Sequence, residues 1–336
     1  MRPREISMSS SETLAPGREP RQFTAALRRA SRYTSFYPLV GLIVVSIVMV
    51  FASDSFLSYS NITNILRQVS INALIAVGMT FVILTGGIDL SVGAVMALCG
   101  TVAAGLMAAG MNGVLALILC LLLGCGFGLA NGAFVAFAGM PPIIVTLATM
   151  GIARGLGLIY TGGYPISGLP RWVNWFGEGR LLGVQTPIVI MLVVYVVGWV
   201  LLERTPFGRY VYAIGGNETA TRLSGVRVAR SKLLIYGLSG FTAAIAAVVL
   251  TGRLMSGQPN AGQGFELDAI AAVVLGGTSI AGGRGSLIGT LLGAMLLGVL
   301  NNGLNMVGVN PYVQTVVKGV IILLAIYIGR ERRRRA

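Results

Sequence analysis

Residues 215–226 read Gly-Gly-Asn-Glu-Thr-Ala-Thr-Arg-Leu-Ser-Gly-Val, a short polar stretch between two strongly apolar blocks. Asn217 suits the cap that starts a helix, and Gly225 suits the left-handed residue that ends one. Glu218 then lies near the positive end of the helix dipole and Arg222 near the negative end, four residues apart in the favourable order. The stretch predicts a capped helix of one to two turns, which either rests on lipid headgroups or docks on a partner.

The chain around this stretch is strongly apolar. Of its 336 residues, 55% are hydrophobic and 11% are charged, whereas soluble domains carry about 25% charged residues. The apolar runs are continuous and not alternating, which predicts an all-α polytopic membrane protein and not a β-barrel. The chain contains no His, which removes imidazole catalysis and His-dependent metal sites, and no metal site is expected.

The net charge of +14 is concentrated in three places. Basic residues gather before residue 37, between 203 and 232, and in 330–335, so each cluster flanks an apolar span. Such clusters are typical of topology signals and of contacts with anionic membrane lipid, and they argue against a nucleic-acid partner. We expect an Arg-rich cytoplasmic tail over 1–36, a membrane domain over 37–329 with a cytoplasmic loop at 203–232, and a basic cytoplasmic tail over 330–336.

Ten apolar runs predict about ten transmembrane helices, six before the loop and four after it. Both counts are even, as they must be if both termini and the loop lie in the cytoplasm. The runs lie near 37–53, 65–85, 91–109, 114–137, 143–161, 186–202, 233–251, 266–281, 286–303 and 311–329.

Two stretches interrupt these runs, 85–93 with the pair Gly86-Gly87 and 275–286 with the pair Gly276-Gly277, and we call them the first and the second break. Such breaks free backbone groups that lipid cannot satisfy, so they must be packed in protein or line a cavity. Asp89 follows the first pair. It either caps a helix that begins at Leu90-Ser91, which we favour, or faces a polar translocation path.

Other polar residues in the apolar runs are also candidates for the path. They could hydrogen-bond a passing hydroxylated solute, or they could pin neighbouring helices to one another. Pinning is the expected role for any one of them taken alone. With Asp89, the candidates are Asn131, Asn301, Asn302 and Asn305.

The sequence contains no phosphate-binding loop and no nucleophile–base pair. We therefore expect a translocation subunit and not an enzyme, with any ATP hydrolysis on a separate chain.

Four stretches resemble those of bacterial ABC sugar-importer permeases of the ribose type, in the branched-chain amino acid/ribose permease superfamily. They are 85–93 (TGGIDLSVG), 215–225 (GGNETATRLSG), 267–279 (LDAIAAVVLGGTS) and 300–305 (LNNGLN), and the resemblance covers roughly 37–329. It implies the type II importer permease fold with ten helices, a homodimer in the bacterial inner membrane, a separate sugar-type ABC ATPase that holds ATP and Mg²⁺, and a periplasmic sugar-binding protein. It also makes the polar helix the contact with that ATPase, through Gly215, Gly216, Asn217, Glu218, Thr221, Arg222, Leu223, Ser224 and Gly225.

Two other classes of transporter stay open at this point. An ion-coupled secondary transporter would use an intramembrane acid, for which Asp89 is the one persuasive candidate. A passive solute channel would need no partner at all. Ribose is the default substrate of the resemblance, but the sequence does not identify the sugar.

Overall fold

Every predicted span contains a helix in the computed structural model, which describes residues 36–321 and residue 323. The predicted tails, apart from Phe36, lie outside these residues. Among the described residues, six helices are long and apolar enough to cross a membrane, and α2 and α4 are shorter apolar helices of 17 residues. This confirms the prediction of an all-α polytopic membrane protein. The span helices are α2 (Phe36–Ala52), α3 (Tyr59–Leu84), α4 (Val92–Ala108), α5 (Gly113–Ala136), α6 (Pro142–Thr161), α8 (Thr186–Arg204), α11 (Val228–Leu254), α12 (Phe265–Leu275), α13 (Leu287–Met306) and a helix at 311–321.

The centre of the bundle is formed by α3 and α11. In the most apolar stretch of each, 78% of the α3 residues and 67% of the α11 residues are buried, against 22% for α5 and for α6. Glycines let α11 approach its neighbours closely: a Cβ at Gly78 of α3 would collide with Ser239, and one at Gly124 of α5 would collide with the Gly240 carbonyl. Close approach of helix backbones through small residues is typical of membrane bundles.

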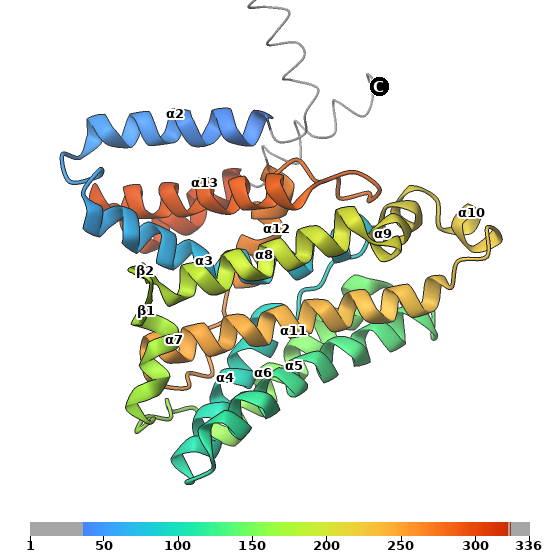
Figure 1. Cartoon of the computed structure of the whole chain (residues 1–336), viewed down its shortest axis with the longest axis horizontal. Coiled ribbons are helices and arrows are strands. Elements are labelled where there is room, and N and C mark those ends of the chain that lie inside the picture. The colour runs from blue at the N-terminus through green and yellow to red at the C-terminus, as the bar shows by residue number, and fades with distance from the viewer. Residues whose placement is uncertain (1–35, 322, 324–336) are drawn as a thin grey trace, which may run out of the picture.

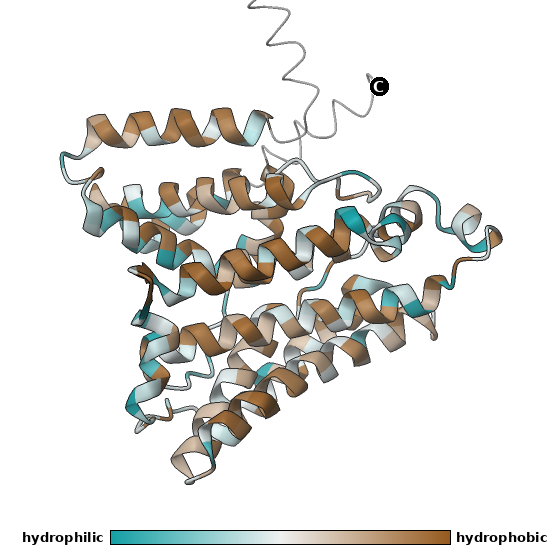
Figure 2. Ribbon diagram, in the orientation of Figure 1, coloured by the Kyte–Doolittle hydropathy of each residue, from teal (hydrophilic) through white to brown (hydrophobic). Residues whose placement is uncertain are grey.

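The two ends of the bundle differ in what they carry (Figure 1). At one end, α9 (Pro206–Gly216) and α10 (Glu218–Leu223) project from the bundle between α8 and α11; we call this the α10 end. At the other end lie η1 (Arg171–Val173), α7 (Asn174–Glu178) and a hairpin of β1 (Arg180–Leu181) and β2 (Val184–Gln185); we call this the hairpin end. Hydrophilic residues gather at these two ends, and hydrophobic residues cover the lengths of the helices between them (Figure 2).

The expectation of a full span at 266–281 is wrong. The helix there, α12, has 11 residues, which at 1.5 Å per residue is about half of a hydrocarbon layer of about 30 Å. The preceding loop instead lies along α4, with Gly257 packed on Thr101 and Gly262 packed on Gly93. Non-helical backbone is tolerated at membrane depth because it is buried in protein here.

The 203–232 loop is also more structured than predicted, because α9 precedes the polar helix. The Thr205 side chain accepts a hydrogen bond from the Gly208 amide, and Pro206 occupies the first helical position, where its missing N–H costs nothing. The Thr-Pro pair at 205–206 is the sequence pattern that would have predicted this helix.

Candidate functional site

The polar stretch forms the predicted helix, α10. Asn217 has extended backbone angles, and its Oδ1 accepts a hydrogen bond from the Ala220 amide at 2.9 Å. Gly225 is left-handed with φ of 84°. Glu218 and Arg222 form the predicted ion pair, with 3.0 Å between Oε1 and Nη2. The start, the end and the charge pattern of this helix are therefore all confirmed.

A second cation, Lys232 of α11, ties α10 to the bundle. Its Nζ lies 2.7 Å from Glu218 Oε2, and its side chain is largely buried. Partial burial works to raise the pKa of Glu218, but the hydrogen bonds and charges of Lys232 and Arg222 outweigh it and hold the pKa below its usual value. Glu218 is therefore ionised at neutral pH. Sequence analysis missed Lys232, although its position one turn into α11 places it opposite α10.

The outer side of α10 is left free within the described chain. Thr221 is buried and donates its hydroxyl to the Asn217 carbonyl, whereas the Leu223 side chain is 84% exposed and the Arg222 side chain 70% exposed. Ser224 is exposed and caps the Ala220 carbonyl. An exposed leucine at the tip of a rigid polar helix is a suitable contact for a partner protein.

The end of α9 rests on both helix breaks. The Gly283 amide, in the second break, donates to the Leu84 carbonyl at the first break, at 2.9 Å. Gly215 lies against both of these main-chain groups, and a Cβ on it would collide with each. Gly282 packs on Gly86 in the same place. The two breaks, about 190 residues apart in the chain, therefore meet directly beneath the junction of α9 and α10.

A tyrosine adds a side-chain link to this junction. The Tyr212 hydroxyl oxygen, on α9, lies 3.0 Å from Glu203 Oε1 and 3.0 Å from the Gly285 carbonyl oxygen of the second break. Burial and the Glu203 charge raise the pKa of Tyr212, so the hydroxyl keeps its proton and remains a donor.

The four predicted break glycines all have a geometric requirement. Gly86 and Gly277 are left-handed, with φ of 79° and 88°, where a residue with a Cβ is strained. A Cβ on Gly87 would collide with the Tyr236 hydroxyl, and one on Gly276 would collide with the backbone of α13. The breaks are packed in protein, which is one of the two arrangements expected from the sequence.

Asp89 lies at the start of α4, where the favoured role puts it. The helix is assigned from Val92, but Ser91 already has helical backbone angles, and the Ser91 side chain makes no capping hydrogen bond. The Asp89 carboxylate instead binds the Ser91 amide, as a capping residue does. Its Oδ1 accepts hydrogen bonds from the Ser91 amide at 3.0 Å and from the Ser91 hydroxyl at 2.6 Å, and its Oδ2 accepts one from Ser239 of α11 at 2.8 Å.

Asn131 continues this buried network to two more helices. Its amide nitrogen donates to the Ser91 hydroxyl at 2.9 Å, and its Oδ1 accepts from Thr149 of α6 at 2.6 Å. The network therefore joins the first break to α5, α6 and α11. Within the described chain, Asp89 and Asn131 use their hydrogen-bonding capacity to hold the break in place.

Two of the three asparagines at the end of α13 also pin helices. Asn302 and Asn61 of α3 exchange amide hydrogen bonds, at 2.8 and 3.1 Å. The Asn305 Oδ1 accepts a hydrogen bond from Gln314 at 2.7 Å. Asn301 differs, because its buried Oδ1 has no partner among the described residues.

The fold and the site together define a polytopic membrane permease in which the end of α9, next to the exposed α10, touches both helix breaks. Among the described residues, no group of three or more His, Cys, Asp and Glu side chains could hold a metal ion. Residues 61–326 match the family described as branched-chain amino acid transport system / permease component, and the chain belongs to this family.

Similar proteins are found over most of the chain. The ribose import permease protein RbsC of Bacillus subtilis is 52% identical, covering 88% of this chain and 92% of the relative. RbsC of Escherichia coli K12 is 48% identical, covering 88% and 93%. The D-allose transport system permease protein AlsC of E. coli is 39% identical, covering 89% and 91%. No solved structure matches this chain.

These matches confirm the resemblance to ribose-type ABC permeases. They also confirm that the chain is a non-enzymatic translocation subunit and a multi-pass protein of the inner membrane.

Proposed function

We propose that this chain forms the membrane path of an ATP-driven importer for ribose or a closely related monosaccharide. The ribose permeases among the relatives support this substrate, and the allose permease, together with an E. coli xylose permease that is 36% identical, extends the class to other monosaccharides. A periplasmic sugar-binding protein delivers the sugar, and a separate ABC ATPase binds ATP and Mg²⁺. The permease itself holds no cofactor.

The contact of α9 with both helix breaks is the observation that carries the coupling proposal. α10 presents Leu223 and Arg222 to the ATPase, and Asn217 and Glu218 keep the helix rigid. A push on α10 then reaches the Gly215 contact at the adjoining end of α9, and from there α3 and α4 through the first break and α12 and α13 through the second. Residues 215–225 thus act as the ATPase contact.

The α10 end lies in the cytoplasm in this proposal, with both termini, and the hairpin end lies in the periplasm. The basic residues of 203–232 support this orientation, because positive charge is retained on the cytoplasmic side. These residues also lie where they contact anionic lipid headgroups.

A second copy of the chain completes the path, in a homodimer. α6 supports this part of the proposal, because it is poorly buried and presents Ala148, Gly151 and Gly155 outward. A Cβ on either glycine would meet no described atom within 4 Å. Small residues four apart let a second helix approach closely.

Asn301 is the predicted path residue that we retain as a contact for passing sugar hydroxyls. Its buried acceptor is unpartnered in the described chain, whereas Asp89, Asn131, Asn302 and Asn305 are engaged with protein groups. These four support the path by fixing the helices around it.

Reconstitution of the permease with its ATPase and binding protein in liposomes tests the proposal. Uptake of labelled ribose should require ATP on the side of the liposome membrane that carries the ATPase. Uptake that collapses with an uncoupler but ignores ATP depletion would show an ion-coupled transporter. Ribose flux through the permease alone would show a passive channel.

The docking role of α10 has a matched pair of variants. Leu223→Asp changes a side chain that is 84% exposed at the α10 end, and Leu182→Asp makes the same change at the hairpin end, where the side chain is 98% exposed. Leu223→Asp should abolish co-purification of the ATPase, and Leu182→Asp should leave it unchanged. Equal retention of the ATPase by both variants would contradict the docking role.

A further inference from the structure

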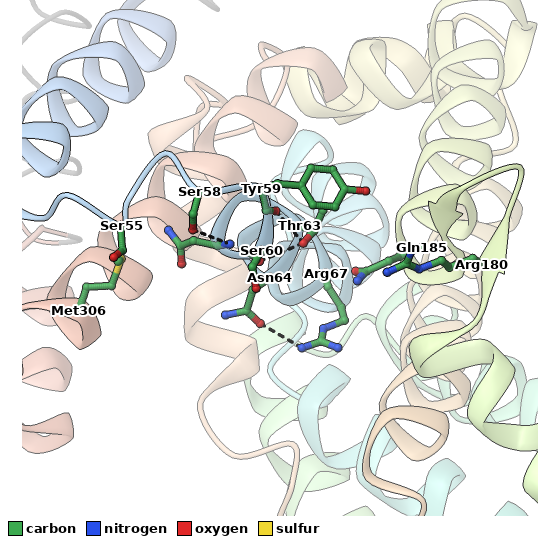
Figure 3. Close-up of a pocket in the computed structure, with 11 residues that line it drawn as sticks. Ser55, Ser58, Tyr59, Ser60, Thr63, Asn64, Arg67, Arg180, Gln185 and Met306 are labelled. Atoms are coloured by element: carbon green, nitrogen blue, oxygen red, sulfur yellow. Dashed lines mark hydrogen bonds between the residues drawn. The ribbon is translucent and has the colours of Figure 1, made fainter.

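A polar cavity of about 480 Å³ opens at the hairpin end of the chain. The first turns of α3 form one side of it, and the hairpin strands form another (Figure 3). Its volume lies within the range of about 300–1,000 Å³ that is usual for small-molecule sites. Its lining is unlike that of a tight apolar pocket, because hydroxyl, amide and guanidinium groups dominate it.

Two buried polar atoms in this lining have no partner among the described residues. One is the Arg67 Nε, a donor on α3, and the other is the Gln185 Oε1, an acceptor on β2. Figure 3 shows the Gln185 and Arg180 side chains extending from the hairpin toward α3. An unpaired buried donor or acceptor carries an uncompensated desolvation penalty, so both favour a ligand that brings an acceptor and a donor together.

The rest of the Arg67 side chain is held in place. One terminal nitrogen lies 3.4 Å from Glu178, and the other donates to Asn64 Oδ1 at 3.1 Å. Glu178 offsets the Arg67 charge, and Nε is left as a fixed donor. A site held by its own neighbours needs little rearrangement when a ligand enters.

We propose that this cavity is a weak entry site for a neutral monosaccharide, between the binding protein and the transmembrane path. A sugar hydroxyl is both a donor and an acceptor, so it satisfies Arg67 Nε and Gln185 Oε1 together. An anion brings acceptors only and would leave Gln185 Oε1 without a donor. Tyr59, whose ring is 71% exposed at the rim, offers a face for the C–H side of the sugar.

The cavity is open to solvent and polar, so binding is weak, with a dissociation constant on the order of tens of millimolar. Weak binding suits a site that must pass its solute onward. The inference rests on the proposed function for its substrate class, but its test needs neither ATP nor transport.

Protection of an introduced thiol tests the site in the full-length permease, in nanodiscs and without binding protein. Ser60→Cys places a thiol on α3 in the cavity lining, and Leu182→Cys places one on the hairpin, at the same end of the bundle but outside the cavity. With a dissociation constant of about 50 mM, about 100 mM ribose should slow modification of Ser60→Cys about threefold, because the rate follows the unoccupied fraction. Modification of Leu182→Cys should not change.

A second substitution shows whether the unpartnered atoms, Arg67 Nε and Gln185 Oε1, are needed for sugar binding. Adding Gln185→Leu, or separately Arg67→Gln, to Ser60→Cys should remove the protection by ribose. Failure of ribose, allose and xylose to protect Ser60→Cys, or equal protection by glycerol, would overturn the entry site. Protection by the binding protein alone, without any effect of free sugar, would make the cavity a protein-docking surface and would also overturn it. Thiol protection together with a failure of ATP-driven uptake would refute the proposed function and leave the site standing.

Discussion

Substitution of Gly215 by alanine probes the contact between α9 and the two helix breaks. A Cβ at this position would lie well inside the contact distance of the Leu84 carbonyl oxygen and the Gly283 amide nitrogen. Both are main-chain atoms, so no rotamer change relieves the clash. Overpacking of this kind costs typically about 1–3 kcal/mol. Gly216→Ala is the matched control for stability, since its Cβ would meet no described atom within 4 Å.

The expected difference follows from these two positions. In an open helical position, replacing Gly by Ala gains up to about 1 kcal/mol, so Gly216→Ala should be neutral or stabilising. The propensity gain applies to both glycines, because both lie in α9, so the two variants should differ by the overpacking cost of about 1–3 kcal/mol. Thermal unfolding of the purified permease in detergent measures this as a lower midpoint for Gly215→Ala.

Transport separates a packing defect from a coupling defect. Gly215→Ala should still co-purify with the ATPase, because the tip of α10 is unchanged, but ATP-driven uptake should fall as α9 is lifted from the breaks. Equal unfolding midpoints for the two alanine variants, with full uptake by Gly215→Ala, would refute the contact as the route of coupling.

Three further outcomes follow from the same structure. Asp89→Ala leaves a buried amide and two hydroxyls without their acceptor and should lower the free energy of unfolding by about 2–5 kcal/mol. Asp89→Asn keeps one acceptor oxygen and should lower it less. Equal losses of stability for the two variants in thermal unfolding would contradict the network. Leu182 is left-handed, with φ of 52°, beside a glycine in a two-residue turn, and this backbone conformation is strained for leucine. Leu182→Asn should therefore stabilise the hairpin by about 1 kcal/mol. Unchanged amide hydrogen exchange in the hairpin would argue against the strain. The pKa of Glu218 is held below its usual 4.5, so its pairing with Lys232 stabilises α10 fully above about pH 4.5 and is lost as pH falls through the lowered pKa. The stability difference between wild type and Glu218→Gln should therefore shrink in acid, and a difference that is constant with pH would contradict the pairing.

The spans and α10 were predictable because their determinants are local. Continuous apolar runs specify membrane helices directly. The Asn217 cap, the Gly225 terminus and the Glu218–Arg222 pair all act within a few residues, so the local sequence determines where α10 begins and ends and how its charges are placed.

The details that the sequence did not predict depend on contacts between distant parts of the chain. The partner of Asn302 is Asn61, 241 residues away, and the Asp89 carboxylate reaches Ser239, 150 residues away. The half-length of α12 depends on the burial of its preceding loop against α4, which no periodicity in 255–281 reveals. The cavity at the hairpin end combines α3 with a hairpin more than 110 residues later, so it had no counterpart in the sequence analysis.

The way α10 is anchored bears on how related importers stay separate in one cell. E. coli K12 alone has ribose, allose and xylose permeases similar to this chain. The fold of α10 depends on groups that face inward or cap its ends, such as Asn217, Thr221 and Lys232. Leu223 makes no contribution to that fold, because its side chain is almost fully exposed. Paralogues are therefore free to diverge at the tip without unfolding the helix, so in the proposed docking role the pairing with a cognate ATPase evolves independently of the stability of the permease.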